Sequence, residues 1–480
     1  MARPLYITTT LPYVNSDPHI GFALEIVHAD IYARYRKLQG DDVFFNTGTD
    51  EHGQKIFEAA RKAGKEPSAY VDEYAAKFRA LKDVLGLSQD IHFIRTTDPH
   101  HVAAAQEMWK RCEAAGDIYP KTYTGLYCVG CEAFKTEKEI VDGKCTLHPS
   151  LTLTEVSEKN YFFKLSKYQD QLREYLSQPG VIVPEWRREE ALKFVEDGLE
   201  DISISREKKD GHNEWGIPVP GDDSQTMYVW FDALTNYIST LGWPEEGGDF
   251  KKFWVDGDTM QMAGKDQVRF QSIIWQAMLM SAQLPRAGRV VYHGFITSGG
   301  QKMSKSLGNV IDPLSIVEEY GTDALRYFLA RHVHPFEDTD VTMEKFKEVY
   351  NADLANGLGN LVSRVMKMAT SNGVQSREQD LKFLDREWEI PELDRYEVNQ
   401  AIESIWSLIT TADSFIQTSQ PFKTIKTDRK QGETDIKVGL LYLIQIAVKL
   451  GVFLPTTSKK IEILIRENKM PESPLFLRKE

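Results

Sequence analysis

The stretch Lys302-Met303-Ser304-Lys305-Ser306 follows, far along the chain, the stretch Pro18-His19-Ile20-Gly21, and the two in this order decide the fold. A lone lysine-rich match of this length is usually a solvated loop, because a long chain meets many short patterns by chance. The pair is informative because each stretch supplies what the other lacks in a site for a triphosphate.

The first stretch predicts a helix N-terminus that follows a strand. Residues 5–10 have a strand-like composition, and Asp17 and Pro18 suit the N-cap and the first turn of a helix. His19 and the small Gly21 then lie where unpaired N–H groups and the helix dipole favour an anionic phosphate. An ordinary turn between a strand and a capped helix is the alternative.

The second stretch places Lys302 and Lys305 on a glycine-rich loop that could close over a triphosphate. Lysine acts there as a mobile point charge. When a carboxylate attacks the α-phosphate of ATP, negative charge builds on the departing pyrophosphate. Cations that meet this charge in the transition state lower the barrier without over-binding ATP.

The order of strand-like and helical segments predicts an α/β protein with a split, Rossmann-like parallel sheet. Strand and helix signals alternate at first, give way near Ile118 to an aromatic, turn-rich insertion, and resume near Tyr228. After Asp340 helical periods dominate, which predicts an all-α C-terminal bundle. The expected units are 1–117 and 228–340 for the two halves of the catalytic domain, 118–227 for the insertion and 341–480 for the bundle.

The composition is that of a globular protein. Hydrophobic residues make up 41% of the 480 positions, enough to bury large cores. The most apolar long segment, 438–454, is interrupted by Gln445 and Lys449, so we expect a core helix there and no membrane span. The N-terminus leads directly into the first strand without a signal peptide, which predicts a cytoplasmic protein.

The net charge of −13 argues against a general affinity for nucleic acids, because non-specific binding depends on many cations that neutralise phosphates. A structured RNA can still be held by local basic faces and by shape. The candidates for such a basic face are Arg326, Arg331, Arg364 and Lys367. For each of them taken alone, the alternative is an ordinary solvated charge.

A zinc knuckle is expected at residues 128–148. A Cys-x2-Cys pair and a Cys-x2-His pair, separated by residues 132–144, have the spacing of a tetrahedral structural zinc site, and Gly130 permits the tight turn. A disulfide is disfavoured in a cytoplasmic protein, and the one other cysteine, Cys112, is isolated. Four protein ligands leave no position for water, so one structural Zn²⁺ per chain is predicted. The ligands are Cys128, Cys131, Cys145 and His148.

Four further strings are Thr9-Thr10-Leu11-Pro12-Tyr13, Gly48-Thr49-Asp50-Glu51-His52-Gly53, Tyr228-Val229-Trp230-Phe231-Asp232-Ala233 and Gly264-Lys265-Asp266. With the two signature stretches they resemble the methionyl-tRNA synthetase family of class I aminoacyl-tRNA synthetases. The likeness spans nearly the whole chain, and the single zinc knuckle is similar to the bacterial form with one metal.

The resemblance implies roles for individual residues. For two aromatic residues that receive a binding role, Trp230 and Tyr237, the alternative role is core packing. For Asp50 the alternative is a turn or helix-cap residue. The implied methionine site has walls from Leu11, Trp230, Ala233 and Tyr237, with Gln271 near the thioether and Asp50 at the α-ammonium group. The implied ATP site, with Mg²⁺ on the nucleotide, uses His19, Gly21, Gly264, Asp266, His293, Ile296 and Lys305, with Arg206 near the substrates. His19, Lys302 and Lys305 are the implied catalytic residues, and Asn360, Arg364 and Phe422 the implied anticodon readers.

The chain departs from the family pattern at three positions. Phe22 stands where the first signature normally ends in a second histidine, and the loss of such a transition-state donor typically costs about 2.7–4 kcal/mol. His28 is too far along the helix to replace it. Gln271 replaces a histidine that is common near the methionine thioether, and Phe422 replaces a tryptophan. Phenylalanine can stack on a base, although core packing explains it equally well.

The sequence therefore predicts an ATP-dependent ligase that forms methionyl-adenylate and transfers methionine to tRNA(Met), releasing AMP and diphosphate. Three alternatives remain: another class I synthetase, a small-molecule nucleotidyltransferase, and a non-catalytic tRNA-binding paralogue, which Phe22 favours. The insertion is too short for a separate editing domain, and no tRNA-binding β-barrel follows the bundle, so a monomer is expected.

Overall fold

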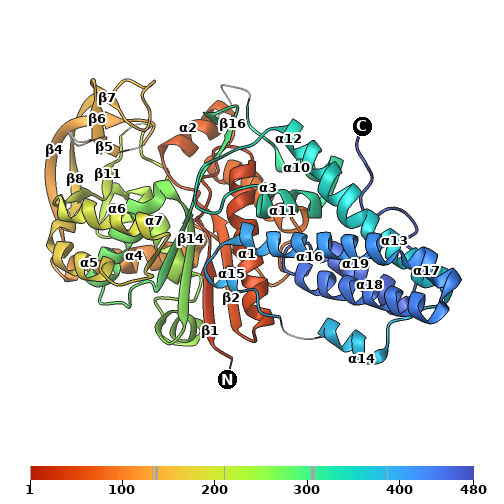
Figure 1. The fold of residues 1–480 in the computed structure, drawn as a ribbon. Helices are drawn as coiled ribbons and strands as arrows, with labels where there is room; N and C mark the ends of the chain where they lie inside the picture. The colour runs from red at the N-terminus through yellow and green to blue at the C-terminus, as the bar shows by residue number, and fades with distance from the viewer. Residues whose placement is uncertain (1, 132, 136–138, 210, 304–308, 386–387) are drawn as a thin grey trace.

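A six-stranded parallel sheet forms the centre of the protein (Figure 1). The computed structural model describes residues 2–131, 133–135, 139–209, 211–303, 309–385 and 388–480. The strand order is β3-β2-β1-β14-β15-β9, with every neighbouring pair parallel. The strands are β1 (Pro4–Thr8), β2 (Asp42–Thr49), β3 (His92–Arg95), β9 (Ile182–Val183), β14 (Asp258–Gly264) and β15 (Arg289–His293).

The direction of the winding reverses between β1 and β14. From β1 the chain builds outward through β2 to β3, whereas β14 and β15 extend the sheet on the other side of β1. The register pairs Leu5 with Asp258 and Thr8 with Gln261. Such a reversal opens a crevice at the carboxyl ends of the two central strands, where ligands bind in open α/β sheets. The predicted split parallel sheet is confirmed.

Alternating side chains of β1 serve two hydrophobic cores. Leu5 and Ile7 belong to the core on the face of α1, whereas Tyr6 belongs to the core on the opposite face. The first face carries α1 (Ile20–Leu38), α3 (Pro67–Val84) and α11 (Thr322–Arg331). The second carries α4 (Pro99–Ala114), α7 (Val229–Leu234), α8 (Asn236–Ser239), η3 (Phe250–Val255), η5 (Phe270–Ile274) and α9 (Trp275–Ser281), while α2 (Gln54–Lys62) and η4 (Lys265–Gln267) follow strand ends.

The inserted segment is built around a long antiparallel pair, β4 (Ile118–Cys128) and β8 (Thr154–Phe163). One strand of this segment, β9, pairs with β15 and forms the edge of the main sheet. Its other elements are β5 (Ala133–Lys135), β6 (Ile140–Val141), β7 (Lys144–Cys145), η2 (Leu165–Tyr168), α5 (Gln169–Leu176), α6 (Glu185–Glu196), β10 (Ile202–Ser203), β11 (Ser205–Glu207), β12 (Pro218–Val219) and β13 (Asp222–Met227).

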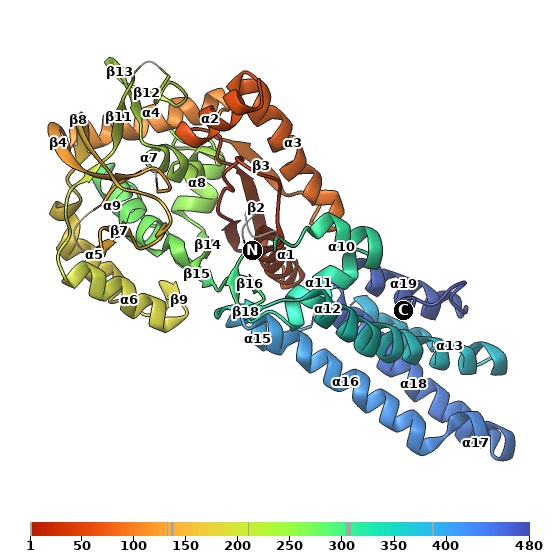
Figure 2. The same cartoon turned by 90° about the horizontal axis from the view of Figure 1, so that it is seen from above.

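Within residues 341–385 and 388–480, all regular elements are helical, and they extend away from the sheet (Figure 2). Their apolar faces join the core of α1 and α11, so the parallel sheet and the C-terminal helices share one core. None of the described helices is long and apolar enough to cross a membrane. The C-terminal helices are α12 (Met343–Val349), η7 (Tyr350–Gly359), α13 (Asn360–Asn372), α14 (Glu378–Leu381), η8 (Lys382–Asp385), α15 (Pro391–Asp394), α16 (Val398–Ser419), α17 (Pro421–Thr427), α18 (Arg429–Leu450) and α19 (Pro455–Glu467).

A small sheet leads into these helices. It consists of β17, β16 and β18, of which β16 and β17 form a hairpin and β18 runs parallel to β16. Helix α10 follows the glycine-rich loop that carries Lys302 and Lys305 (the lysine loop) and precedes α11. The elements are β16 (Ile296–Ser298), β17 (Gln301–Lys302), α10 (Pro313–Tyr320) and β18 (Thr339–Asp340).

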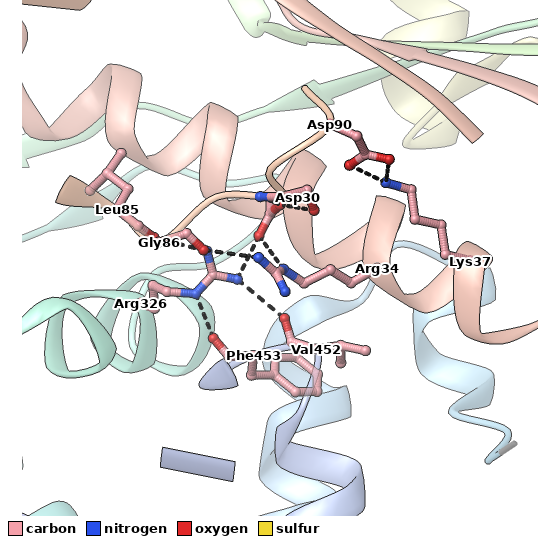
Figure 3. A network of polar contacts seen from close by, with 10 residues as sticks. Asp30, Arg34, Lys37, Leu85, Gly86, Asp90, Arg326, Val452 and Phe453 are labelled. Atoms are coloured by element: carbon pink, nitrogen blue, oxygen red, sulfur yellow. Dashed lines mark hydrogen bonds and ion pairs between the residues drawn. The ribbon is translucent and has the colours of Figure 1, made fainter. Parts of the chain in front are cut away.

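A buried arginine locks the shared core (Figure 3). Arg326 of α11 has no exposed surface and pairs with Asp30 of α1 at 2.8 Å. Its guanidinium also donates to the carbonyl oxygens of Leu85, Val452 and Phe453. The expectation that Arg326 lies on a tRNA-binding face is therefore wrong. Its N–H groups bind partners in three other segments of the chain, at Asp30, Leu85 and 452–453.

Arg331 is also engaged within the protein. Its guanidinium contacts Glu403 at 2.7 Å and Asp353 at 3.1 Å, and it lies 5.0 Å from the centre of the Trp406 ring. These contacts tie α11 to η7 and α16. Arg331 is thus a cross-link of the helical part rather than the free basic residue that the sequence suggested.

We expect Arg326→Ala to lower the free energy of unfolding by about 3–5 kcal/mol, because it removes one of the two guanidinium groups that pair with the buried Asp30 carboxylate and leaves three buried carbonyl oxygens without their donor. Denaturant or thermal unfolding would measure the change. Lys37→Ala is the control: Lys37 pairs with Asp90 in the same region, but that carboxylate is 64% exposed, and an exposed pair contributes less than about 1 kcal/mol. Equal losses in the two variants would contradict the assignment.

Candidate active site and metal centre

A cavity of about 1170 Å³ opens at the carboxyl ends of the central strands and reaches toward the insertion. Residues distant in sequence meet there, as the crevice between β1 and β14 requires. Most of the predicted site residues line it together: Leu11, His19, Gly21, Asp50, Arg206, Trp230, Ala233, Tyr237, Gly264, Asp266, His293 and Ile296. Met303 also lines the cavity, whereas Gln271 is not among the lining residues.

His19 is the N-cap of α1. Its Nδ1 accepts a hydrogen bond from the Gly21 backbone N–H at 3.1 Å, and the helix begins at Ile20. The expectation that Asp17 caps the helix is wrong, because Asp17 instead pairs with Lys77 of α3 at 2.8 Å. A Cβ on Gly21 would lie 3.0 Å from the His19 ring, so a larger residue would push the ring away from its capping position.

Phe22 packs edge to face against Phe78 of α3, with ring centroids 5.4 Å apart. Both rings line the cavity beside α1, the helix that begins in the first signature stretch (the signature helix). His28 cannot supply the missing histidine, as expected: it is buried and donates from Nε2 to the Leu329 carbonyl at 3.0 Å. Burial lowers the pKa of His28 to about 4, so the ring is neutral at physiological pH.

His293 ends β15 and is held from both ring nitrogens. Nε2 lies 2.8 Å from the Glu25 carboxylate, and Nδ1 lies 2.7 Å from the Gly294 carbonyl. Glu25 of α1 also accepts from the backbone N–H and the hydroxyl of Thr10. Burial alone would lower the pKa of His293, but the Glu25 carboxylate raises it above the usual value. No motif in the sequence indicated Glu25, whose carboxylate joins the ends of β1 and β15 to the signature helix.

Gly264 and Asp266 form the turn after β14. A Cβ on Gly264 would lie 2.8 Å from Oδ1 of Asp266 and 3.7 Å from the His293 ring. The turn therefore needs glycine to bring the carboxylate close to the strand end. Asp266 Oδ2 accepts from the Gln267 amide at 3.2 Å. This leaves a carboxylate and an imidazole on one rim of the cavity.

The opposite rim is aromatic. Trp230 of α7 stacks on Phe270 of η5 with centroids 4.0 Å apart. Tyr237 of α8 is buried and accepts a hydrogen bond at its hydroxyl from the Gln271 side-chain amide. Gln271 thus contacts Tyr237 without lining the cavity itself. Such a wall suits an apolar, polarisable side chain.

Asp50 lies at the end of β2, beside the loop that follows β1. Its backbone N–H donates to the Pro12 carbonyl at 3.0 Å, and its own carbonyl accepts from Val14 at 3.1 Å. These bonds tie the residue to the strand-to-helix loop that carries Leu11. Its side chain is buried and lines the cavity.

The lysine loop can be followed only in part. Lys302 lies in β17 and Met303 lines the cavity. Lys305 lies outside the described residues, as do Ser304 and Ser306. The catalytic roles of Lys302 and Lys305 remain predictions.

The four predicted metal ligands meet in one cluster. Their ligand atoms all lie within 4.8 Å of one another. Cys131 Sγ is 3.5 Å from Cys145 Sγ and 3.2 Å from Nδ1 of His148. Soft thiolates and an imidazole in this number are the donors that a tetrahedral zinc site uses. A Cβ on Gly130 would lie 2.5 Å from the His148 ring, so only glycine fits this turn.

Polar contacts attach the knuckle to the walls of the cavity. Lys55 of α2 donates to the Gly130 carbonyl within the first Cys-x2-Cys turn. Glu139 accepts from Arg269, the residue before Phe270, at 3.0 Å. The metal cluster is therefore positioned against both the Asp50 side and the aromatic side of the cavity.

The three predicted anticodon readers lie in the helical part. Asn360 begins α13 and is exposed, while Arg364 one turn later pairs with Asp413 of α16. Phe422 of α17 is 44% exposed, which rules out core packing as its role. Lys367 is exposed on α13. Anticodon binding by these residues remains a prediction.

Comparisons with known proteins agree with this arrangement. The family tRNA synthetases class I (M) matches residues 5–152 and 138–366. Methionine–tRNA ligase of a Nostoc species is 42% identical over 93% of this chain and 86% of its own length, and that of Brucella suis is 41% identical over 95% and 90%. The chain belongs to the methionine–tRNA ligase family.

Solved structures of this family have the same fold. Mycobacterium tuberculosis methionyl-tRNA synthetase in complex with methionyl-adenylate matches with a TM-score of 0.87 at 37% identity, covering 96% of this chain and 93% of that chain. The apo form of the same enzyme matches with a TM-score of 0.83 at 32% identity, covering 100% and 99%. The predicted membership of the methionyl-tRNA synthetase family is confirmed.

We expect Cys145→Ser to lose bound zinc, because it removes one of four thiolate or imidazole donors. Metal analysis of the purified protein would show about one zinc per chain before the change and a small fraction of one after it. Cys112→Ala is the control, since Cys112 is buried in another core. Equal metal content in wild type and Cys145→Ser would contradict the ligand assignment.

Proposed function

We propose that this protein activates L-methionine with ATP to methionyl-adenylate, releasing diphosphate, and then transfers the methionyl group to tRNA(Met), releasing AMP. The observation that carries the proposal is the meeting, in one cavity at the switch point of the sheet, of the His19 helix cap, Asp50 and the wall formed by Trp230 and Tyr237. These groups offer the three kinds of recognition that the first reaction needs: for a phosphate, an ammonium group and an apolar side chain.

The methionine subsite lies between Asp50 and the aromatic rim. The Asp50 carboxylate would accept the α-ammonium group, an interaction that charge-assisted hydrogen bonds make strong. Leu11, Trp230, Ala233 and Tyr237 would surround the thioether. Gln271 would act through Tyr237, because its amide N–H donates to the phenol oxygen and leaves the phenol proton free to point toward the pocket.

The ATP subsite lies along the carboxyl ends of β14 and β15. Gly264 allows a sugar or base to approach the backbone, and Asp266, His293 and Ile296 would hold the nucleoside. The α1 N-terminus with His19 would face the phosphates, where the helix dipole favours negative charge. Lys302, Lys305 and Mg²⁺ on the nucleotide would meet the charge that builds on the leaving diphosphate.

The second reaction needs a tRNA partner and a stable framework. We assign anticodon recognition to Asn360, Arg364 and Phe422, whose exposed ring can stack on a base. The knuckle would hold one Zn²⁺ through Cys128, Cys131, Cys145 and His148, and the metal when bound supplies structural order. We further propose a cytoplasmic monomer.

Amino-acid-dependent ATP–pyrophosphate exchange tests the first reaction. Exchange is expected with methionine and not with leucine, isoleucine, valine or cysteine. A second candidate, a tRNA-binding paralogue without activity, is favoured by Phe22 alone. Absence of exchange from folded, zinc-loaded protein that still binds tRNA would support the paralogue and overturn the enzyme.

Asp50→Asn should raise the KM for methionine in this exchange by about 10- to 100-fold, because a charge-assisted hydrogen bond is replaced by a neutral one. The KM for ATP should change little. Asp90→Asn, at an exposed carboxylate remote from the cavity, is the matched control. An unchanged KM for methionine would refute the role of Asp50.

Phe22→His should raise kcat of exchange about tenfold or more, because it returns a donor beside the phosphates. It should also lower stability by roughly 1 kcal/mol through loss of the edge-to-face contact with Phe78. Phe22→Leu removes the same ring contact without adding a donor, so it should lower stability and leave kcat near wild type. A kcat for Phe22→His no higher than for Phe22→Leu would show that another group already fills this role.

A further inference from the structure

Behind the aromatic rim, one buried carboxylate binds two histidines. Asp232 of α7 lies 2.7 Å from Nδ1 of His52 through one oxygen and 2.8 Å from Nε2 of His101 through the other. Asp232, His52 and His101 are all buried. None of the three is part of the proposed methionine or ATP subsite.

The proton pattern of this network follows from its partners. The second ring nitrogen of His101, Nδ1, lies 2.9 Å from the Ser239 hydroxyl. A carboxylate oxygen can only accept, so Nε2 of His101 and Nδ1 of His52 donate to the two oxygens of Asp232. Burial would raise the pKa of Asp232, but the two imidazoles hold it below its usual value. The carboxylate is thus ionised and accepts from both sides.

The network joins the parts that carry the methionine subsite. His52 lies two residues after Asp50, in the loop between β2 and α2, and His101 lies on α4. Asp232 shares the short helix α7 with Trp230 and Ala233, and Ser239 shares α8 with Tyr237. Fixing the Asp232 side chain therefore fixes the distance between the carboxylate side and the aromatic side of the pocket.

Two other contacts of the loop that carries His52 lead to parts of the protein other than α7. Glu51 is held by Arg95, and its carbonyl accepts from the Trp215 indole at 2.6 Å. These contacts attach the loop to β3 and to the insertion. Among the hydrogen bonds of the described residues, the one between His52 and Asp232 connects this loop directly to α7.

We propose that His52, Asp232 and His101 are positioning residues. They shape the methionine subsite by fixing the position of Asp50 relative to α7. The inference rests on the proposed function. None of the three side chains lines the cavity. They act through Asp50 on one side and through Trp230 and Ala233 on the other, and small misplacements of such groups weaken binding strongly.

ATP–pyrophosphate exchange with separate titration of each substrate tests the proposal. His52→Ala should raise the KM for methionine about fivefold or more, with the KM for ATP and the kcat per titrated active site within about twofold of wild type. His52→Asn should restore the methionine KM, because its amide N–H can replace the Nδ1 donor. Asp232→Asn keeps the shape but loses one acceptor, and it should resemble His52→Ala if the alanine variant does not fold.

His100→Ala is the matched control. His100 is the neighbour of His101 on α4. Its Nε2 lies 2.8 Å from the Ser239 carbonyl, and among the described residues it makes no hydrogen bond to Asp232, so both KM values should stay unchanged. An unchanged methionine KM in His52→Ala and Asp232→Asn would overturn the inference while leaving the proposed function intact. If the variants only reduce the number of titrated active sites and leave the methionine KM unchanged, the inference is also overturned, because fewer active sites indicate a folding defect. No exchange by wild type would overturn the proposed function and this inference with it.

Discussion

The parallel pairing of β1 with β14 is the constraint on which the site depends. It joins strands that begin at Pro4 and Asp258, with the whole insertion between them in the sequence. Because this pair is the point at which the sheet reverses its winding, its carboxyl end is open. The signature helix, the Asp50 loop and the Gly264 turn all meet at that opening, and none of them could form a site alone.

Buried charges fix how the parts surround this opening. Arg326 and Asp30 lock the signature helix to the C-terminal core, Glu25 joins that helix to His293, and Asp232 joins the Asp50 loop to the aromatic wall. The carboxylates of Asp30, Glu25 and Asp232 each have an opposite charge or several hydrogen-bond donors beside them, as burial in a low dielectric demands. A pair of this kind adds little net stability over apolar packing, but it makes the wrong arrangement costly.

Much of the site was predictable because its residues occur in short strings whose chemistry is local. The spacing of metal ligands and the start of a helix after a strand are set within a few residues, so the four knuckle ligands and the signature helix could be placed from sequence, whereas Gly264 came from the family resemblance. The cap itself was wrongly given to Asp17, because the competing ion pair with Lys77 is a contact across 60 positions. Arg326 and Arg331 were misplaced for the same reason: their partners lie in segments distant in the sequence.

The sequence by itself determined the family, the parallel sheet, the helical C-terminal part and the metal ligand set, because periodicity and motif spacing are properties of neighbouring residues. Only the tertiary structure decided which charges are buried, that β9 joins the main sheet, that Phe22 packs on Phe78, and that Glu25 and Asp232 hold the site together. These features depend on which distant segments come into contact. Burial then sets the energy of each polar group, and burial is a property of the packed whole.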